Sequence, residues 1–250
     1  MINRNRSAFT SFSLFLLLSL SLAASWSTVA RAQNKSIYTS KKHQVTFEPP
    51  QGTKPEQTVG GASRGEQCPS DSIEQNQPLT PLLPMGSRSL TVESHPTLLV
   101  YVPNTSATQA LLSVRDANED YDYQTTMSIG DRPGIVKLTL PEDAPALDVG
   151  REYQWSLILM CDNRLRPDSP VVQGDIMRVI SERHLQNKLA QADLYESAAI
   201  YGDAGLWYDT LSSLAKLKTN NPKDINIASN WEGLLNSVGL ENVAKAEFVE

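Results

Sequence analysis

The chain has 250 residues, of which 40% are hydrophobic, and its 28 acidic residues outnumber 22 lysines and arginines to give a formal net charge of −6. Such acidity excludes nonspecific nucleic-acid binding, which needs a basic surface, and argues against docking on anionic lipid. The chain also contains no phosphate-binding loop and no dinucleotide-binding fingerprint.

Residues 1–32 have the parts of a secretory signal peptide. Arg4 and Arg6 precede an apolar run at 11–24, and an Ala-Arg-Ala sequence at 30–32 supplies the small residues of a cleavage site. The run is too short for a typical membrane span. Cleavage removes three arginines and no acid, which leaves 19 basic and 28 acidic residues and a net charge of −9. We expect export to the cell envelope or beyond; the alternative is a retained N-terminal helical anchor.

Residues 33–84 are predicted to form a disordered or extended tether. The segment is rich in Gln, Pro, Ser, Gly and Lys, and its few apolar residues show no sustained period. One short strand is allowed at 43–49. A Gly-x-Ser-x-Gly pattern around Ser63 lacks the preceding strand and the following helix that make this motif a nucleophile elbow. We therefore assign Ser63 no catalytic role.

Residues 85–180 have the sequence pattern of an antiparallel β-sandwich. Short alternating runs are separated by segments rich in turn residues, without helical interruption. The predicted strands are 97–102, 109–116, 121–129, 134–140, 152–161 and 170–180. Along the fifth run, one parity collects Tyr153, Trp155, Leu157, Leu159 and Cys161, which places Trp155 and Cys161 on the inward face.

The segment Leu147-x-x-Gly150-x-x-Tyr153 leads into that strand. It resembles the tyrosine corner of immunoglobulin-like and fibronectin type III sandwiches, in which a Tyr hydroxyl binds the preceding connection. The resemblance implies a structural role for Tyr153.

The two cysteines, Cys68 and Cys161, are 93 residues apart and have no histidine cluster near them, so metal binding is not indicated. In an oxidising compartment we predict a disulfide, and closing so long a loop stabilises a fold by about 4–5 kcal/mol in the chain-entropy model. The alternative is a pair of inert buried thiols.

Residues 181–245 change to a helical period and are predicted to form a small separate domain. The spacing resembles one tetratricopeptide repeat, a two-helix unit that ends in proline; its positions are Leu194, Ala198, Tyr201, Gly205, Trp207, Leu214, Leu217 and Pro222. Thr210 and Ser197 depart from the usual Ala and Leu. A further helix at about 224–238 is expected to cap the unit. Tyr201 and Trp207 are predicted to be core residues between its helices.

Other candidate chemistry is sparse. Asp116, Asn118, Asp120 and Asp122 stand at alternate positions, as at the start of a calcium loop, but the later Gly and acidic ligand are missing. We keep them as a weak calcium candidate beside the simpler reading of a charged hairpin turn. His43, His95 and His184 have no metal-ligand spacing, and Glu142 and Asp143 have no base partner. We therefore predict no catalytic residue and no cofactor.

Several motifs together are similar to an uncharacterised exported family, the domain of unknown function 928, seen mostly in cyanobacteria. They are Gly60-Gly61-x-x-Arg64-Gly65 leading to Cys68, then "LLVYVP" (98–103), "PGIVKLTLP" (133–141), "YQWSLILMCD" (153–162), "GLWYDTL" (205–211) and "LLNSVGLE" (234–241). The resemblance covers about residues 55–245. It implies export but no activity, substrate or catalytic residue.

These patterns predict an α+β protein without enzymatic activity. Its two architectures are commonly used for recognition, which favours a binding or scaffold module of the cell envelope whose partner is another envelope protein. The alternative is an accessory module that binds carbohydrate or calcium through the sandwich loops, and an enzyme with an unrecognised site ranks third. The oligomeric state stays open.

Overall fold

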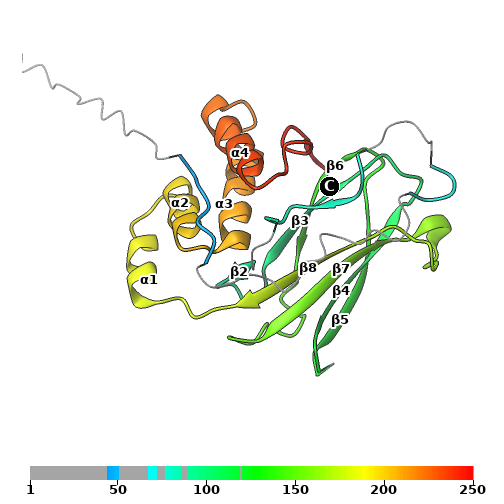
Figure 1. Ribbon diagram of the computed structural model, residues 1–250, viewed down its shortest axis with the longest axis horizontal. Coiled ribbons are helices and arrows are strands. Elements are labelled where there is room, and N and C mark those ends of the chain that lie inside the picture. Colours follow the sequence, from blue (N-terminus) through cyan, green and yellow to red (C-terminus); the bar gives the residue numbers. More distant parts are fainter. Residues whose placement is uncertain (1–43, 51–66, 72–76, 86–88, 119, 250) are drawn as a thin grey trace, which may run out of the picture. The chain divides into compact units, whose positions relative to one another are not determined.

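Six strands form where the alternating runs predict them, in a computed structural model that describes residues 44–50, 67–71, 77–85, 89–118 and 120–249 (Figure 1). The strands are β3 (Thr97–Val102), β4 (Gln109–Asp116), β5 (Asp122–Ser128), β6 (Gly134–Thr139), β7 (Glu152–Leu159) and β8 (Val171–Arg178). The prediction of these strands is confirmed. The predicted signal peptide 1–32, His43 and Ser63 lie outside the described residues. Over the described ranges, no helix is both long and apolar enough to cross a bilayer.

Three further strands have two residues each, too few to show an alternation. They are β1 (Thr80–Pro81), β2 (Leu90–Thr91) and β9 (Phe248–Val249). The strands form sheet A, in the order β1-β3-β6-β9, and sheet B, in the order β2-β8-β7-β4-β5. We expected wholly antiparallel sheets, but the pairs β2–β8 and β6–β9 are parallel. Short strands that join an edge after a long excursion of the chain can run in either direction.

The inner faces of the two sheets share one buried core. Sheet A contributes Leu98, Val100, Val136 and Leu138, and sheet B contributes Leu112, Val114, Trp155, Leu157, Val172 and Ile176. Gly174 on β8 lies opposite Trp155, and a Cβ at this position would come within 2.7 Å of two atoms of the indole ring. A glycine is therefore required where the large ring fills the space between the sheets.

The predicted disulfide between Cys68 and Cys161 is confirmed. The two Cα atoms are 5.5 Å apart and both residues are buried. The Asp71 carboxylate accepts hydrogen bonds at 2.9 Å from the Cys68 amide and the Thr105 hydroxyl, and another from the Ser106 amide. Partial burial opposes its ionisation, but these hydrogen bonds outweigh that effect and lower the pKa of Asp71 below its usual value.

Helices follow β8, as the change of period predicts. They are α1 (Arg183–Leu189), α2 (Leu194–Asp203), α3 (Trp207–Asn220) and α4 (Ile225–Ser237); a short 3₁₀ turn, η1 (Cys161–Asn163), lies between β7 and β8. Asp193 and Glu196 form a reciprocal capping box at the start of α2. The Asp224 carboxylate accepts hydrogen bonds from the Asn226 and Ile227 amides in the first turn of α4. With two sheets and four helices in the described residues, the α+β class is confirmed.

The helices cover the outer face of sheet A. Leu99 and Ile135 point away from the inner core and belong to a second buried cluster with helical residues, including Ala198, Trp207, Leu211, Leu214, Trp231 and Leu234. Sheet B, sheet A and the helices thus form three successive layers (Figure 1). The separate helical domain that we expect from residue 181 stays a prediction. Leu99 of β3 and Ile135 of β6 belong to the same buried cluster as the helices, because each strand has apolar side chains on both faces.

Part of the predicted tether is packed rather than extended in solvent. No strand forms at 44–50, but the Val45 side chain is buried and the Val45 amide donates to Asn230 Oδ1 at 2.8 Å. The Glu48 amide donates to the Gly202 carbonyl at 3.1 Å. A Cβ on Gly202 would collide with the Thr46 carbonyl, so this helix accepts the segment only because position 202 is glycine.

Candidate functional site

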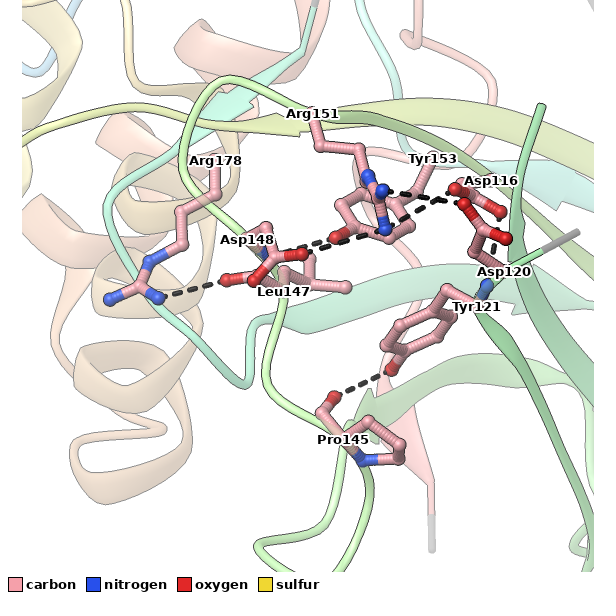
Figure 2. Close-up of polar contacts among 9 residues, drawn as sticks. All are labelled: Asp116, Asp120, Tyr121, Pro145, Leu147, Asp148, Arg151, Tyr153 and Arg178. Carbon is pink, nitrogen blue, oxygen red and sulfur yellow. Dashed lines mark hydrogen bonds and ion pairs between the residues drawn. The ribbon is translucent and has the colours of Figure 1, made fainter. Parts of the chain in front are cut away.

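Arg151, which no sequence pattern singles out, gathers three carboxylates at one end of sheet B. Its guanidinium lies 3.4 Å from Asp116, 3.6 Å from Asp120 and 3.5 Å from Asp148 (Figure 2). The Asp116 side chain is only 2% exposed, whereas Asp120 and Asp148 are open to solvent. A buried carboxylate needs such a cation, because desolvation without a partner costs several kcal/mol. Arg151 therefore acts first as the counter-ion of Asp116.

The weak calcium candidate is only partly brought together. Asp116 and Asp120 converge on Arg151, but the exposed carboxylate of Asp122 accepts a hydrogen bond from Gln124 instead. Asn118 lines the same recess without an ion-pair role. In the described part of the chain, no three His, Cys, Asp or Glu side chains are grouped to hold a metal ion. The place that a cation would take is next to a guanidinium, which repels it.

Two tyrosines fasten the connection between β6 and β7 beside this cluster (Figure 2). The Tyr153 hydroxyl accepts a hydrogen bond from the Asp148 amide at 2.8 Å, and the Tyr121 hydroxyl donates to the Pro145 carbonyl at 2.7 Å. Burial raises the pKa of Tyr121 to about 12, and its tyrosine neighbours Tyr153 and Tyr123 add to the effect. Tyr121 therefore remains a neutral donor at physiological pH, and these contacts serve structure rather than proton transfer.

Arg178 on β8 fixes the same connection from the other side. It donates to the Leu147 carbonyl at 2.8 Å (Figure 2). It also donates to the Val92 carbonyl at 3.3 Å. His95 contributes too, since its Nε2 lies 3.0 Å from the Ala144 carbonyl. The connection is thus held at Ala144, Pro145, Leu147 and Asp148.

A shallow recess of about 380 Å³ opens next to Arg151. Its lining residues are Asp116, Ala117, Asn118, Gly150, Arg151, Glu152 and Met177. These side chains include no Ser, Cys, His or Lys that could act as a nucleophile or a base near neutral pH. The recess can offer hydrogen-bond acceptors to a polar group, but its guanidinium already faces three carboxylates.

The outer face of sheet B carries a more regular arrangement, in three rows that cross β5, β4, β7 and β8. The first is Thr126, Leu111, Ile158 and Val171; the second is Gln124, Ser113, Ser156 and Gln173; the third is Asp122, Arg115, Gln154 and Asp175. All twelve side chains are half-buried or exposed. The first row therefore has three aliphatic residues and one threonine, the second has amides and hydroxyls, and the third has three charged residues and one glutamine. None of the twelve is aromatic.

The remaining residues singled out by sequence lie in packing roles. Trp155 is fully buried, and its Nε1 donates to the Tyr208 hydroxyl at 2.7 Å. Trp207 is also fully buried and donates to the Leu82 carbonyl at 2.8 Å. Tyr201 is only half-buried, in contrast to the core position that we expected. Pro222 and His184 are exposed.

The first turn of α3 joins the layers through residues that the sequence pattern does not reveal. The Tyr208 hydroxyl donates to the Asp175 carbonyl at 2.9 Å, while the Asp209 carboxylate accepts from the Thr91 hydroxyl and the Val92 amide, both at 3.3 Å. Burial raises the pKa of Asp209 to about 7, and Glu93 adds to that rise. An Asp among the large apolar residues of the first turn of α3 is a signal that could have indicated this junction.

A family model described as Domain of Unknown Function (DUF928) matches residues 59–248. No curated protein matches the chain.

Proposed function

The chain belongs to the DUF928 family, and from this premise we propose that it is a non-enzymatic binding or scaffold module of the cell envelope, which holds another envelope protein on the outer face of sheet B. The observation that carries the proposal is the row Leu111, Ile158 and Val171, which lies beside the polar row, with the charged row beyond it, on a face that no described helix covers (Figure 1).

A protein partner fits this face better than a sugar. Protein interfaces typically have an apolar centre surrounded by a polar rim. Sugar-binding faces depend on flat aromatic rings, and the three rows contain none. The side chains stand on paired strands, which hold a binding surface more rigidly than loops do. The carbohydrate or calcium alternative would use the sandwich loops, and in the recess at Arg151 the guanidinium is already paired with Asp116.

The helical layer is less suited to partner capture. We infer that α2 and α3 form a tetratricopeptide-like pair, supported by Trp207, which is buried between them and packs edge-on against Phe47 with ring centroids 4.9 Å apart. The pair is covered by sheet A on one side and by residues 44–50 on another. An immunoglobulin-like ancestry of the sheets is supported by the contact of Tyr153 with Asp148.

Export is supported by the disulfide, because such bonds form and persist outside the reducing cytosol. The N-terminal pattern at 1–32 adds to this argument. Localisation of a tagged full-length chain by fractionation tests export independently of binding.

The binding proposal is tested with Ile158→Asp, which places a charge in the centre of the aliphatic row. Cross-linking in envelope extract, with a photoreactive group at Ser156, identifies the partner, whose affinity is then measured with purified proteins. We expect Ile158→Asp to weaken binding at least about tenfold. The control is Lys188→Asp, on an exposed position of α1. Equal binding by both variants, with folding intact, would refute the proposed surface.

A further inference from the structure

Strand β5 forms a long open edge. Among the described residues the two sheets end at β1, β9, β2 and β5, and the first three have only two residues each. β5 has seven, and in the described part of the chain only β4 pairs with it. An unpaired strand of this length presents a row of backbone donors and acceptors that can bind another strand.

The backbone groups that face the open edge can be identified. The Ile129 amide donates to the Thr108 carbonyl at 3.0 Å, and the Asp116 amide donates to the Tyr121 carbonyl at 3.2 Å. Antiparallel pairs alternate between hydrogen-bonded and non-hydrogen-bonded positions, so the odd-numbered residues of β5 bind β4. The amides and carbonyls of the even-numbered residues point outward, at Asp122, Gln124, Thr126 and Ser128.

The usual protection of an edge is missing from β5. Natural edges are commonly shielded by lysine, proline, a bulge or a short strand. The sequence "DYQTTMS" contains no lysine or proline, and its register with β4 is continuous from Asp122 to Ser128, which excludes a bulge. Its single charge stands at the first residue. Both the length and the composition of β5 therefore permit pairing.

We propose that β5 pairs antiparallel with β5 of a second copy of this chain, around a two-fold axis at Thr125, so that the two B sheets become continuous. In this register Asp122 faces Ser128 of the second copy and Gln124 faces Thr126 of the second copy. Every outward amide and carbonyl of the strand then has a partner, which gives about eight backbone hydrogen bonds. An axis at Gln124 would leave Ser128 unpaired, and an axis at Thr126 would place Asp122 opposite Gly130.

The side chains fit this register as well as the backbone. The two Asp122 residues lie at opposite ends of the paired strands, roughly 20 Å apart, so no like charges face each other. Tyr123 and Met127 are half-buried at the margin of the inner core. They face one another across the axis, where the closer spacing of a non-hydrogen-bonded pair brings a sulfur against an aromatic ring. This self-complementarity selects a second copy over an unrelated strand.

The first test is the oligomeric state of the full exported chain, measured by sedimentation over a range of concentrations. Thr126→Pro removes one outward amide from each copy and leaves the bonds to β4 intact, whereas Thr126→Val keeps the amide in a similar shape. We expect a dimer whose Kd rises roughly 30-fold with Thr126→Pro, from two lost hydrogen bonds, and is unchanged by Thr126→Val. A monomer throughout, or equal Kd values for the two variants, overturns the proposal.

A cross-linking test reads the register and does not depend on Thr126→Pro folding. Facing residues in a non-hydrogen-bonded pair have Cα atoms about 4.5 Å apart, within the roughly 4.4–6.8 Å that a disulfide spans. Mild oxidation should therefore link Thr125→Cys into covalent dimers, while Gln124→Cys and Thr126→Cys stay largely unlinked. Pairing around Thr125 is contradicted if Gln124→Cys or Thr126→Cys links preferentially, or if none of the three variants links. Monomers that bind only a foreign strand at this edge contradict it equally.

Discussion

Sheet A and sheet B differ in what covers their outer faces. Sheet A is apolar on both faces, because its inner face packs on sheet B and its outer face packs on the helices. Sheet B packs on one face only, and its outer face shows polar side chains around one aliphatic row. The comparison teaches that sheet A is enclosed by a buried cluster on each face, while sheet B leaves one face open, which is the face that we propose binds a partner.

Breaking the disulfide tests how the segment around Cys68 is attached next to β7 of sheet B. Of the changes considered, it should lower the free energy of unfolding most. We expect Cys161→Ser to lower the free energy of unfolding by about 4–5 kcal/mol, because the unfolded chain regains the freedom of a long loop. Denaturant titration of the oxidised protein measures this loss. Cys68→Ser is the matched control and should lose the same amount, since either change opens the same bond. Unequal losses would point to packing rather than loop closure.

Removing Trp207 tests the layer between the helices and sheet A. Trp207→Ala deletes a fully buried ring and its hydrogen bond to Leu82, so we expect a loss of about 3–5 kcal/mol. The control is Ile180→Ala, at a residue 72% exposed, which should cost little. Thermal unfolding is followed in parallel by the helical and strand signals, to decide whether the helices and the sheets unfold as one unit. One shared transition indicates a common core, whereas early loss of the helical signal alone indicates a separate helical domain.

Sequence predicted the elements whose side chains follow a period over many residues. Strands such as β4 and β7 alternate over eight residues, so both their position and their inward face could be deduced. β2 has only two residues, and its place beside β8 depends on α3 and Asp209, which are far away in the chain. Local patterns carry no information of that kind.

The candidate site was less predictable for the same reason. The aspartates around Asp120 stand out in sequence as cation ligands. Their partner, Arg151, lies in the connection between β6 and β7 and is part of no recognisable motif. The packed segment 44–50 also reads as a polar tether, since Val45 and Phe47 are its hydrophobic residues that pack in the helical cluster. Its burial depends on glycine at position 202, which a single sequence shows only as a helix breaker.

The junction of α3 with β2 should respond to pH. Because folding raises the pKa of Asp209 to about 7, the native chain holds a proton that the unfolded chain releases near pH 4. The contribution of Asp209 is therefore most favourable below about pH 4 and is lost as the pH rises towards 7, by at most about 4 kcal/mol. Asp209→Asn should remove this dependence, and unfolding measured at pH 5 and pH 8 checks it.

Asp203→Asn, at an exposed position of α2, is the control for that measurement. Asp71 acts in the opposite sense, because its lowered pKa makes its contribution present above about pH 4 and lost in more acidic solution. Asp71 is present in both Asp209→Asn and the unmodified chain, so the difference between their pH dependences reports Asp209 alone. An unchanged slope between pH 5 and pH 8 would show that Asp209 is ionised throughout.

The smallest expected effect concerns the end of sheet B, where Tyr121 binds the Pro145 carbonyl. Tyr121→Phe keeps the ring and its edge contact with Tyr153, at a centroid distance of 5.0 Å, but removes the donor. We expect a loss of about 1 kcal/mol, the usual net value of one such hydrogen bond, because the stranded carbonyl can still reach solvent at the margin of the sheet. Tyr123→Phe, on the same face of β5, controls for loss of a phenolic hydroxyl. If both variants unfold alike, Tyr121 is held by packing alone. If only Tyr121→Phe is weaker, and partner binding on the outer face is kept, the fastening of the β6–β7 connection and the recognition surface are separate properties of the same sheet.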